Sequence, residues 1–255
     1  MLHAEVEGSG PRTVLVHGFT QTRRSWGRIG IALARHFEVV RVDAPGHGGS
    51  SQVVTDLAGG ARLLGTVGGR ASYLGYSMGA RLCLQLALDE PSLVRSLVLV
   101  SGTAGIADAE GRRRRRSADD RLATELEQIG LEEFLRRWLA GPLFASLEPA
   151  EADLDARREN TAEGLAASLR RAGTGAQEPL WSRLHGLAMP VLVVAGGKDV
   201  VFCDRAKAMV SAIGSNAELA LIPDAGHAVH LERPEAFLAV VEPFLTRSDA
   251  TASDQ

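Results

Sequence analysis

Three residues that lie far apart in the chain have the side-chain types that serine-based catalysis needs. Ser77 lies in the middle of residues 75–79 (GYSMG), where a glycine two residues to either side of the serine permits close approach of the backbone. Asp199 and His227 each follow a short apolar run. A histidine that a carboxylate orients can accept the proton of a serine hydroxyl, so the pattern predicts a catalytic triad of these residues.

Backbone amides near the serine are predicted to bind a negatively charged oxygen. Residues 14–19 end a predicted strand in a loop, and Phe19 in that loop can offer its amide beside that of Met78, the residue after the serine. Two such N–H donors stabilise the oxyanion that develops in a transition state. We therefore expect Phe19 and Met78 to form an oxyanion hole through their backbones.

Other histidines and acids are candidates for the same roles. His47 lies in a glycine-rich turn, which favours a structural role, and His17 is expected to support the oxyanion loop. His230 follows the triad histidine by three residues, a position suited to the pocket or to the surface. Asp204 is the alternative acid but is interpreted as a helix N-cap, and Asp224 is expected to shape its own turn.

The alternation of apolar runs with helical patterns predicts the framework that positions these residues. Strands are expected at 13–16, 38–42, 72–74, 96–100, 191–195 and 218–222. Helices are expected at 25–36, 53–66, 78–89, 204–213 and 234–245. Strands that alternate with helices form a parallel sheet covered on both faces, so the fold class is α/β.

The pattern changes between residues 104 and 186, where strand-like runs vanish and helix formers, arginine and glutamate become frequent. This segment is expected above the carboxyl ends of the strands, where ligands bind in open α/β sheets. We predict a core made of residues 1–103 and 187–246, a helical cap over a pocket at 104–186, and a frayed polar tail at 247–255.

Bulk composition argues against several classes of partner. The net charge of −3 over 255 residues gives no attraction to nucleic acid or to an acidic membrane. No apolar run reaches the roughly 18 residues of a membrane span, and no signal peptide is evident. Cys83 and Cys203 lie in apolar segments and are expected to be buried, reduced thiols, which favours a cytoplasmic location. No motif predicts a metal or any other cofactor, and no obligate protein partner is expected.

Over nearly its whole length the chain resembles the α/β-hydrolase superfamily, whose fold is a mostly parallel, doubly wound sheet with a helical cap insertion. Residues 75–81, 134–147 and 164–177 narrow the resemblance to the SHCHC (2-succinyl-6-hydroxy-2,4-cyclohexadiene-1-carboxylate) synthases of menaquinone biosynthesis. The two cap segments, 134–147 and 164–177, are the more specific evidence for this family, because a sharp turn around a serine and a catalytic triad occur throughout the superfamily. Ala80 and residues 196–199 depart from the family pattern, but neither departure removes a catalytic group.

The resemblance implies elimination of pyruvate from an enolpyruvyl-succinyl-hydroxycyclohexene carboxylate, without consumption of water. Ser77, activated by His227 and Asp199, would remove a ring proton beside the succinyl ketone while the oxyanion-hole amides hold the enolate oxygen. A serine that acts as a base in this way is never acylated.

The substrate implied by the resemblance is a small-molecule polycarboxylate with three carboxylates, which requires fixed cations, preferably arginines. Arg81 follows Ser77 by one helical turn and is expected beside the pocket. The family pattern adds further pocket residues: Tyr76, Arg116, Trp138, Phe144 and Arg157. Four of them have a structural alternative: a surface salt bridge for Arg81, a cap core for Trp138 and Phe144, and a solvated helical face for Arg116 in the arginine run 112–116. Only one arginine of that run is expected to reach a ligand.

Two other functions stay open at this point. A serine hydrolase that acts on an ester or on a carbon–carbon bond of a diketone would use the same triad. Such an enzyme does not need arginines that converge on one ligand. A non-catalytic ligand receptor on this fold would tolerate loss of the triad, so the intact triad argues against it.

Overall fold

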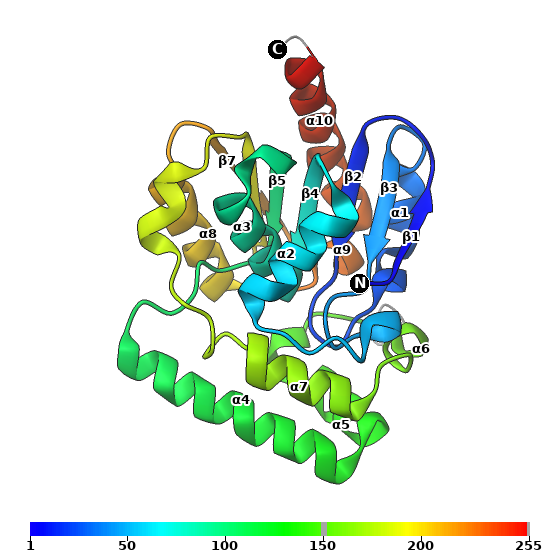
Figure 1. The fold of residues 1–255 in the computed structure, drawn as a ribbon, viewed down its shortest axis with the longest axis vertical. Helices are drawn as coiled ribbons and strands as arrows, with labels where there is room; N and C mark the ends of the chain where they lie inside the picture. Colours follow the sequence, from blue (N-terminus) through cyan, green and yellow to red (C-terminus); the bar gives the residue numbers. More distant parts are fainter. Residues whose placement is uncertain (149–151, 254–255) are drawn as a thin grey trace.

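The computed structural model describes residues 1–148 and 152–253, and a seven-stranded sheet forms its centre (Figure 1). The strands are β1 (Ala4–Glu7), β2 (Arg12–Val16), β3 (Glu38–Val42), β4 (Ala71–Tyr76), β5 (Val94–Val100), β6 (Val191–Gly196) and β7 (Ala217–Ile222). Their order in the sheet is β1-β3-β2-β4-β5-β6-β7. β1 pairs antiparallel with β3, and the other neighbouring pairs are parallel. The predicted parallel sheet is confirmed, with one antiparallel strand added at its edge.

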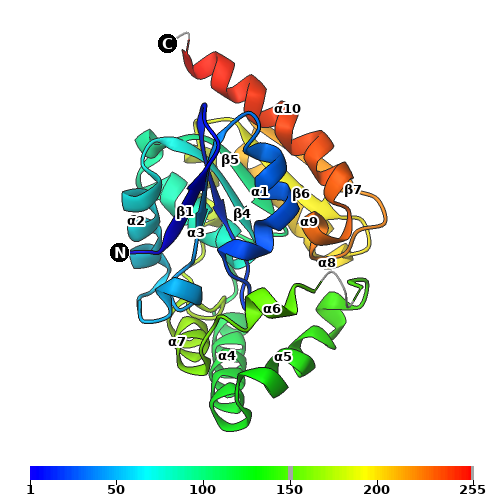
Figure 2. The same ribbon diagram turned by 90° about the vertical axis from the view of Figure 1, so that its right-hand side faces the viewer.

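Helices cover both faces of this sheet (Figures 1 and 2). The core helices are α1 (Gly27–Leu33), α2 (Leu57–Gly68), α3 (Met78–Asp89), α8 (Val200–Ile213), α9 (Val229–Glu232) and α10 (Pro234–Ser253). One face packs against α2, α3 and α8, and the other packs against α1 and α10. Successive side chains of a strand point to opposite faces, so in β4 Tyr73 packs with the first layer and Leu74 with the second. A strand buried on both faces therefore needs a continuous apolar run.

Four further helices lie together beyond one end of the sheet (Figures 1 and 2). They are α4 (Ala109–Ile129), α5 (Leu131–Leu139), α6 (Leu154–Arg157) and α7 (Ala162–Ala172). Asp108 caps α4, because its carboxylate accepts a hydrogen bond from the amide of Gly111. Leu126 of α4 packs with Leu165 of α7 and with Phe134 in a small apolar core separate from that of the sheet. Because this group buries its own apolar surface, we propose that residues 104–186 form the cap.

Buried polar contacts anchor the returning segment of the cap to the core. The side-chain oxygen of Asn160 accepts a hydrogen bond from the amide of Gly48 at 3.0 Å, and its nitrogen donates to the carbonyl of Thr20 at 2.8 Å. Next to it, Arg23 of the core forms an ion pair with Glu159 at 3.3 Å. These contacts hold the cap against the loops that follow β2 and β3.

Several elements of the core differ from their predicted bounds, among them α8 and β1. Helix α8 begins at Val200, since Asp199 caps it by accepting a hydrogen bond from Phe202 N at 3.2 Å. Asp204 is therefore not the N-cap. It lies exposed within the helix, where its Oδ1 forms an ion pair with Lys207 Nζ at 3.6 Å. The edge strand β1 was not predicted, because its sequence AEVE is only half-buried and lacks an apolar run.

The predicted frayed tail is wrong for its first part. Helix α10 continues to Ser253 and does not end at residue 245. Ser248 and Asp249 are buried, and Asp249 lies 3.4 Å from Arg95 in an ion pair, which holds this end of the helix against the core. Residues 254 and 255 lie outside the described residues. Across the described part of the chain, no helix has both the length and the apolar character required to cross a membrane.

Candidate active site

Ser77 lies in the sharp turn between β4 and α3. Its φ of 51° and ψ of −104° fall outside the regions that non-glycine residues favour, so the turn is strained. A side chain on Gly75 would collide with the backbone of Gly79, and one on Gly79 would collide with the backbone of Val16. Both glycines are therefore a packing requirement of the turn that presents the serine.

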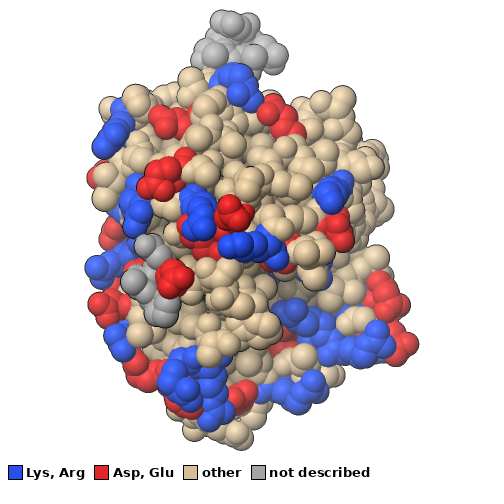
Figure 3. All heavy atoms as spheres, turned by 180° about the vertical axis from the view of Figure 1, so that it is seen from behind, with Lys and Arg blue, Asp and Glu red and all other residues tan. Residues whose placement is uncertain are grey.

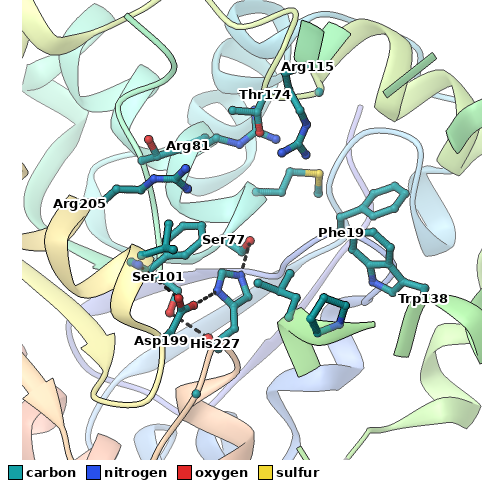
Figure 4. Close-up of a pocket in the computed structure, with 18 of the residues that line it drawn as sticks. Phe19, Ser77, Arg81, Ser101, Arg115, Trp138, Thr174, Asp199, Arg205 and His227 are labelled. Atoms are coloured by element: carbon teal, nitrogen blue, oxygen red, sulfur yellow. Dashed lines mark hydrogen bonds and ion pairs between the residues drawn. The ribbon is translucent and has the colours of Figure 1, made fainter. Parts of the chain in front are cut away.

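His227 bridges Ser77 and Asp199 (Figure 4). Its Nε2 lies 3.1 Å from Ser77 Oγ, and its Nδ1 lies 2.8 Å from Asp199 Oδ2. The other carboxylate oxygen of Asp199 caps α8, so both oxygens are held in place. Asp199 thereby favours the tautomer with a proton on Nδ1, which leaves Nε2 as the acceptor for the serine proton.

The loop that carries His227 is fixed by two side chains from outside the triad. Ser101, directly after β5, donates its hydroxyl to the carbonyl of His227 at 2.8 Å. The Glu232 carboxylate accepts hydrogen bonds from the backbone amides of Gly226, at 2.7 Å, and of Ala228, at 3.0 Å. Since charged acceptors form strong hydrogen bonds, the histidine is held in position before any ligand binds.

The amides proposed for the oxyanion hole are free to bind a ligand. Among the described residues, neither Phe19 nor Met78 donates a backbone hydrogen bond to the protein. Met78 is the first residue of α3, where amide groups have no acceptor within the helix. Both residues line the same cavity as Ser77, which supports their proposed role.

His17 connects the loop that carries Phe19 to the end of β3. Its Nε2 accepts a hydrogen bond from the amide of Ala44 at 3.0 Å, and its Nδ1 lies 2.8 Å from the carbonyl of Gly18. This pattern requires a neutral ring with its proton on Nδ1. The ring of His47 lies 5.1 Å away and is also buried, with its Nδ1 on the carbonyl of Pro45.

Acidification is expected to destabilise the fold through these two histidines. Burial lowers the pKa of His17 to about 4 and that of His47 to about 3, from an ordinary value of 6.5. As the pH falls from about 6.5 to about 4, the unfolded chain binds protons that the folded protein does not, so the free energy of unfolding decreases. Urea unfolding at pH values of about 7.5, 6 and 5 should show falling midpoints, and His47→Gln should weaken the trend. Equal midpoints at all three pH values would contradict this expectation.

His230 lies neither at the pocket nor on the surface, the two positions that its sequence context left open. It is 1% exposed, and its ring packs 4.5 Å from that of Tyr76 and 4.7 Å from that of Trp26. Burial lowers its pKa to about 3, and the charges of Arg157 and His227 act in the same direction. His230 is therefore a neutral core residue.

A cavity of about 760 Å³ opens at Ser77 between the core and the cap (Figure 4). Its lining includes Phe19, Ser77, Met78, Arg81, Ser101, Thr103, Ile106, Arg115, Trp138, Pro142, Leu143, Ser168, Thr174, Lys198, Asp199, Val200, Val201, Phe202, Arg205 and His227. The volume lies within the range of about 300–1,000 Å³ that is usual for small-molecule sites. Apolar walls with a few converging polar groups are typical of such sites.

Arg81 reaches this cavity from α3 although it is only 6% exposed. Its Nη1 donates to the carbonyl of Ala172 at 2.8 Å and to Gln177 Oε1 at 3.2 Å. Burial lowers the pKa of Arg81 to about 10, and the charge of Arg115 adds to the shift. The guanidinium therefore keeps its charge at neutral pH, and its other N–H groups remain available to an anion.

Within the arginine run 112–116, the residue that lines the cavity is Arg115 and not Arg116. Adjacent residues of a helix point about 100° apart, so Arg116 lies on the exposed surface. Arg115 donates to Asp119 at 2.7 Å, and Arg114 forms an ion pair with Glu110. Figure 3 shows basic and acidic atoms side by side on the lower part of the molecule, where the cap lies. The run is thus mainly a solvated face, and we replace Arg116 by Arg115 in the proposed site.

Three other predicted binding residues lie behind the wall of the cavity and do not line it. Arg157 is 1% exposed and donates a hydrogen bond from its guanidinium to the hydroxyl of Thr20. Its guanidinium carbon lies 5.9 Å from the centre of the Phe144 ring. The rings of Phe144 and Tyr76 lie 6.3 Å and 5.4 Å from that of His227. In this structure the three side chains support His227 and the loop that carries Thr20.

Trp138 combines the two roles considered for it. Its ring lines the cavity, and it also packs against Phe19 at 5.4 Å and Phe144 at 5.8 Å. The contact with Phe19 is edge-to-face, at 87° between the rings. An aromatic wall of this kind offers an apolar surface to the uncharged part of a ligand.

Sequence reasoning placed the cavity arginine of the run one residue away from Arg115, and it missed Arg205 and Ser101, which also line the cavity. A signal for Arg205 was present, because a helix that begins after Asp199 places Phe202 and Arg205, three residues apart, on one face. Ser101 had a weaker signal, its position directly after a strand that ends at the same edge as β4.

Comparisons with known proteins agree with the fold and the site. Residues 13–240 match the model of the alpha/beta hydrolase family. The chain is 34% identical over 245 residues to the 2-succinyl-6-hydroxy-2,4-cyclohexadiene-1-carboxylate synthase of Klebsiella pneumoniae. This match covers 92% of this chain and 94% of that protein. MenH from S. aureus superposes with a TM-score of 0.90 at 29% identity, covering 98% of this chain and 100% of that one. A thermophilic esterase from Thermogutta terrifontis, solved with malate bound, has a TM-score of 0.83 at 25% identity over 97% of this chain and 93% of that one.

Proposed function

Because this chain belongs to the alpha/beta hydrolase family and, within it, to the SHCHC synthases, we propose that it eliminates pyruvate from its substrate with Ser77 as the base. The chain is an enzyme of menaquinone biosynthesis that acts on a small molecule. One observation supports the catalytic assignment above all: the hydrogen-bonded series Asp199–His227–Ser77 opens on a cavity lined by arginines. Buried free thiols at Cys83 and Cys203 support a cytoplasmic location.

The reaction begins with removal of the ring proton beside the succinyl ketone. Ser77 accepts this proton as its own hydroxyl proton moves to His227 Nε2, 3.1 Å away, and Asp199 stabilises the resulting imidazolium. The electron pair of the broken C–H bond forms an enolate, whose oxygen accepts hydrogen bonds from the amides of Phe19 and Met78.

The enolate then returns its electron pair to the ring. The carbon–oxygen bond to the enolpyruvyl group breaks, a second double bond forms in the ring, and the departing enolate gains a proton to become pyruvate. The imidazolium of His227 can supply that proton, which returns the triad to its starting state. The reaction consumes no water, and no covalent bond forms between the substrate and Ser77.

Arginines in the cavity suit a substrate with several carboxylates. Arg81 is almost fully buried, and among the described residues its side chain has hydrogen bonds only to the uncharged groups of Ala172 and Gln177. A buried cation without a close anion is costly, and a bound carboxylate removes that cost. We propose that Arg81 and Arg115 bind two carboxylates of the substrate while Trp138 and Phe19 contact its ring.

A serine hydrolase of carboxylic esters is the second candidate. The triad geometry suits it equally, and the similar esterase structure shows that the fold accommodates such chemistry in another protein. The arginines favour elimination, since an uncharged ester gains nothing from them.

The assay that tests the function measures pyruvate. Incubation of the purified protein with the enolpyruvyl substrate should release pyruvate in a one-to-one ratio with SHCHC, detected through lactate dehydrogenase and through the absorbance of the conjugated diene. A neutral aryl ester of similar size serves as the control substrate. If the ester turns over far faster than the enolpyruvyl substrate, the hydrolase becomes the better description.

A further inference from the structure

Arg205 is a cation of the cavity to which the reaction above gives no role. It lies on the second turn of α8, half-buried, and lines the cavity together with Ser77. Its guanidinium carbon lies 4.6 Å from the centre of the Phe202 ring, which in turn lies 4.5 Å from the ring of His227. Among the described residues, Arg205 has no hydrogen bond or ion pair through its side chain.

The stacked position prepares this guanidinium for an anion. A guanidinium over an aromatic face is held by the cation–π attraction, while its N–H groups point outward in its own plane. That arrangement leaves an edge of the group free to grip a carboxylate with two hydrogen bonds. Because Phe202 already restricts the side chain, less conformational entropy is lost on binding.

The charges around Arg205 leave room for an added anion. Burial lowers its pKa, Asp199 opposes this effect, and Arg115 reinforces it. Asp199 is occupied, since its oxygens accept hydrogen bonds from Phe202 N and His227 Nδ1. Asp119 is in contact with Arg115 and not with Arg205. No described acidic side chain therefore neutralises Arg205 through direct contact, and the guanidinium can bind an anion of a ligand.

We infer that Arg205 binds a carboxylate of the substrate and makes the site selective for polyanions. Figure 4 shows Arg81, Arg115 and Arg205 grouped on one side of the pocket, whereas Phe19 and Trp138 lie on another. Three helices, α3, α4 and α8, thus supply one guanidinium each, which matches three carboxylates on the proposed substrate. The inference rests on the proposed function for the identity of the ligand.

The test compares Arg205→Ala, Arg205→Lys and the control Lys207→Ala. Lys207 lies on the same helix but is exposed and paired with Asp204, so its loss should leave turnover unchanged. Arg205→Ala should lower kcat/KM for pyruvate release by about 10- to 100-fold, mainly through KM, and Arg205→Lys should recover part of the loss. Pyruvate and succinate, tested separately as competitive inhibitors, report which carboxylate is bound.

The outcomes separate this inference from the proposed function. Weaker inhibition of Arg205→Ala by either pyruvate or succinate, at an unchanged melting temperature, supports carboxylate binding and identifies the carboxylate. Unchanged KM, or a loss of turnover with both inhibition constants unaltered, overturns it. If wild-type protein releases no pyruvate, the proposed function fails, and thermal stabilisation by succinate in wild type but not in Arg205→Ala still tests the anion site.

Discussion

Replacement of Ser77 by alanine is expected to lower the rate of pyruvate release by about 10²- to 10⁴-fold, the usual contribution of a positioned general base. Alanine keeps the Cβ atom and the strained turn but removes the only hydroxyl within hydrogen-bond distance of His227 Nε2 in the described structure. The histidine then has no serine to activate. A lactate dehydrogenase assay at saturating substrate measures the loss directly, because kcat reports the step after binding.

Ser92→Ala is the matched control for this experiment, since Ser92 is exposed and does not line the cavity. Both variants should melt at the wild-type temperature. Intact mass spectrometry of the wild-type enzyme, quenched during turnover, should show no added mass. An acylated Ser77, or a Ser77→Ala variant that retains substantial activity, would refute the serine as a base.

Replacement of Arg81 by alanine should weaken transition-state binding by about 2 to 5 kcal/mol, a loss in kcat/KM of about 30-fold to several thousand-fold. The reason is burial: at 6% exposure the guanidinium is largely dehydrated, so its attraction for a carboxylate is weakly screened. Arg81→Lys retains the charge but loses the planar pair of donors, and should fall between wild type and alanine. Kinetics of pyruvate release over a range of substrate concentrations give kcat/KM for each variant.

Loss of Arg81 also removes its contacts with Ala172 and Gln177, so stability must be measured alongside activity. Arg62→Ala on the neighbouring helix α2 controls for the removal of an arginine, because Arg62 is exposed. If kcat/KM for Arg81→Ala stays within about threefold of wild type, the change in transition-state binding is less than about 1 kcal/mol. That result would assign Arg81 a purely structural role.

The sequence predicted well which residues the fold brings together at the proposed catalytic centre, because the signals there are local. The turn around Ser77 needs glycines at two particular positions, and the acid and the histidine each follow a strand, so their spacing in sequence translates directly into a place in the sheet. The parallel sheet and its covering helices followed from the same alternation of apolar runs. The short edge strand β1 lacked that signal and was missed.

The sequence was less informative about the arginines because side-chain direction on a helix changes by about 100° with each residue. Both Arg115 and Arg116 are exposed, but an error of one position separates Arg115, which lines the cavity, from Arg116, which does not. Arg205 was missed for a related reason, since assigning the N-cap to Asp204 instead of Asp199 placed the start of α8 too late. Arg157 is buried by contacts between distant segments, which no local pattern reports.

The two parts of the site have different freedom to change during evolution. Asp199 and His227 are fixed by backbone contacts that also determine where a helix begins and how a loop is folded, so mutations there damage structure and chemistry together. The three cavity arginines belong to three separate helices and can be exchanged one at a time. A duplicated gene could thus acquire a new anionic or neutral substrate by stepwise substitution of these arginines, while it inherits the catalytic centre intact.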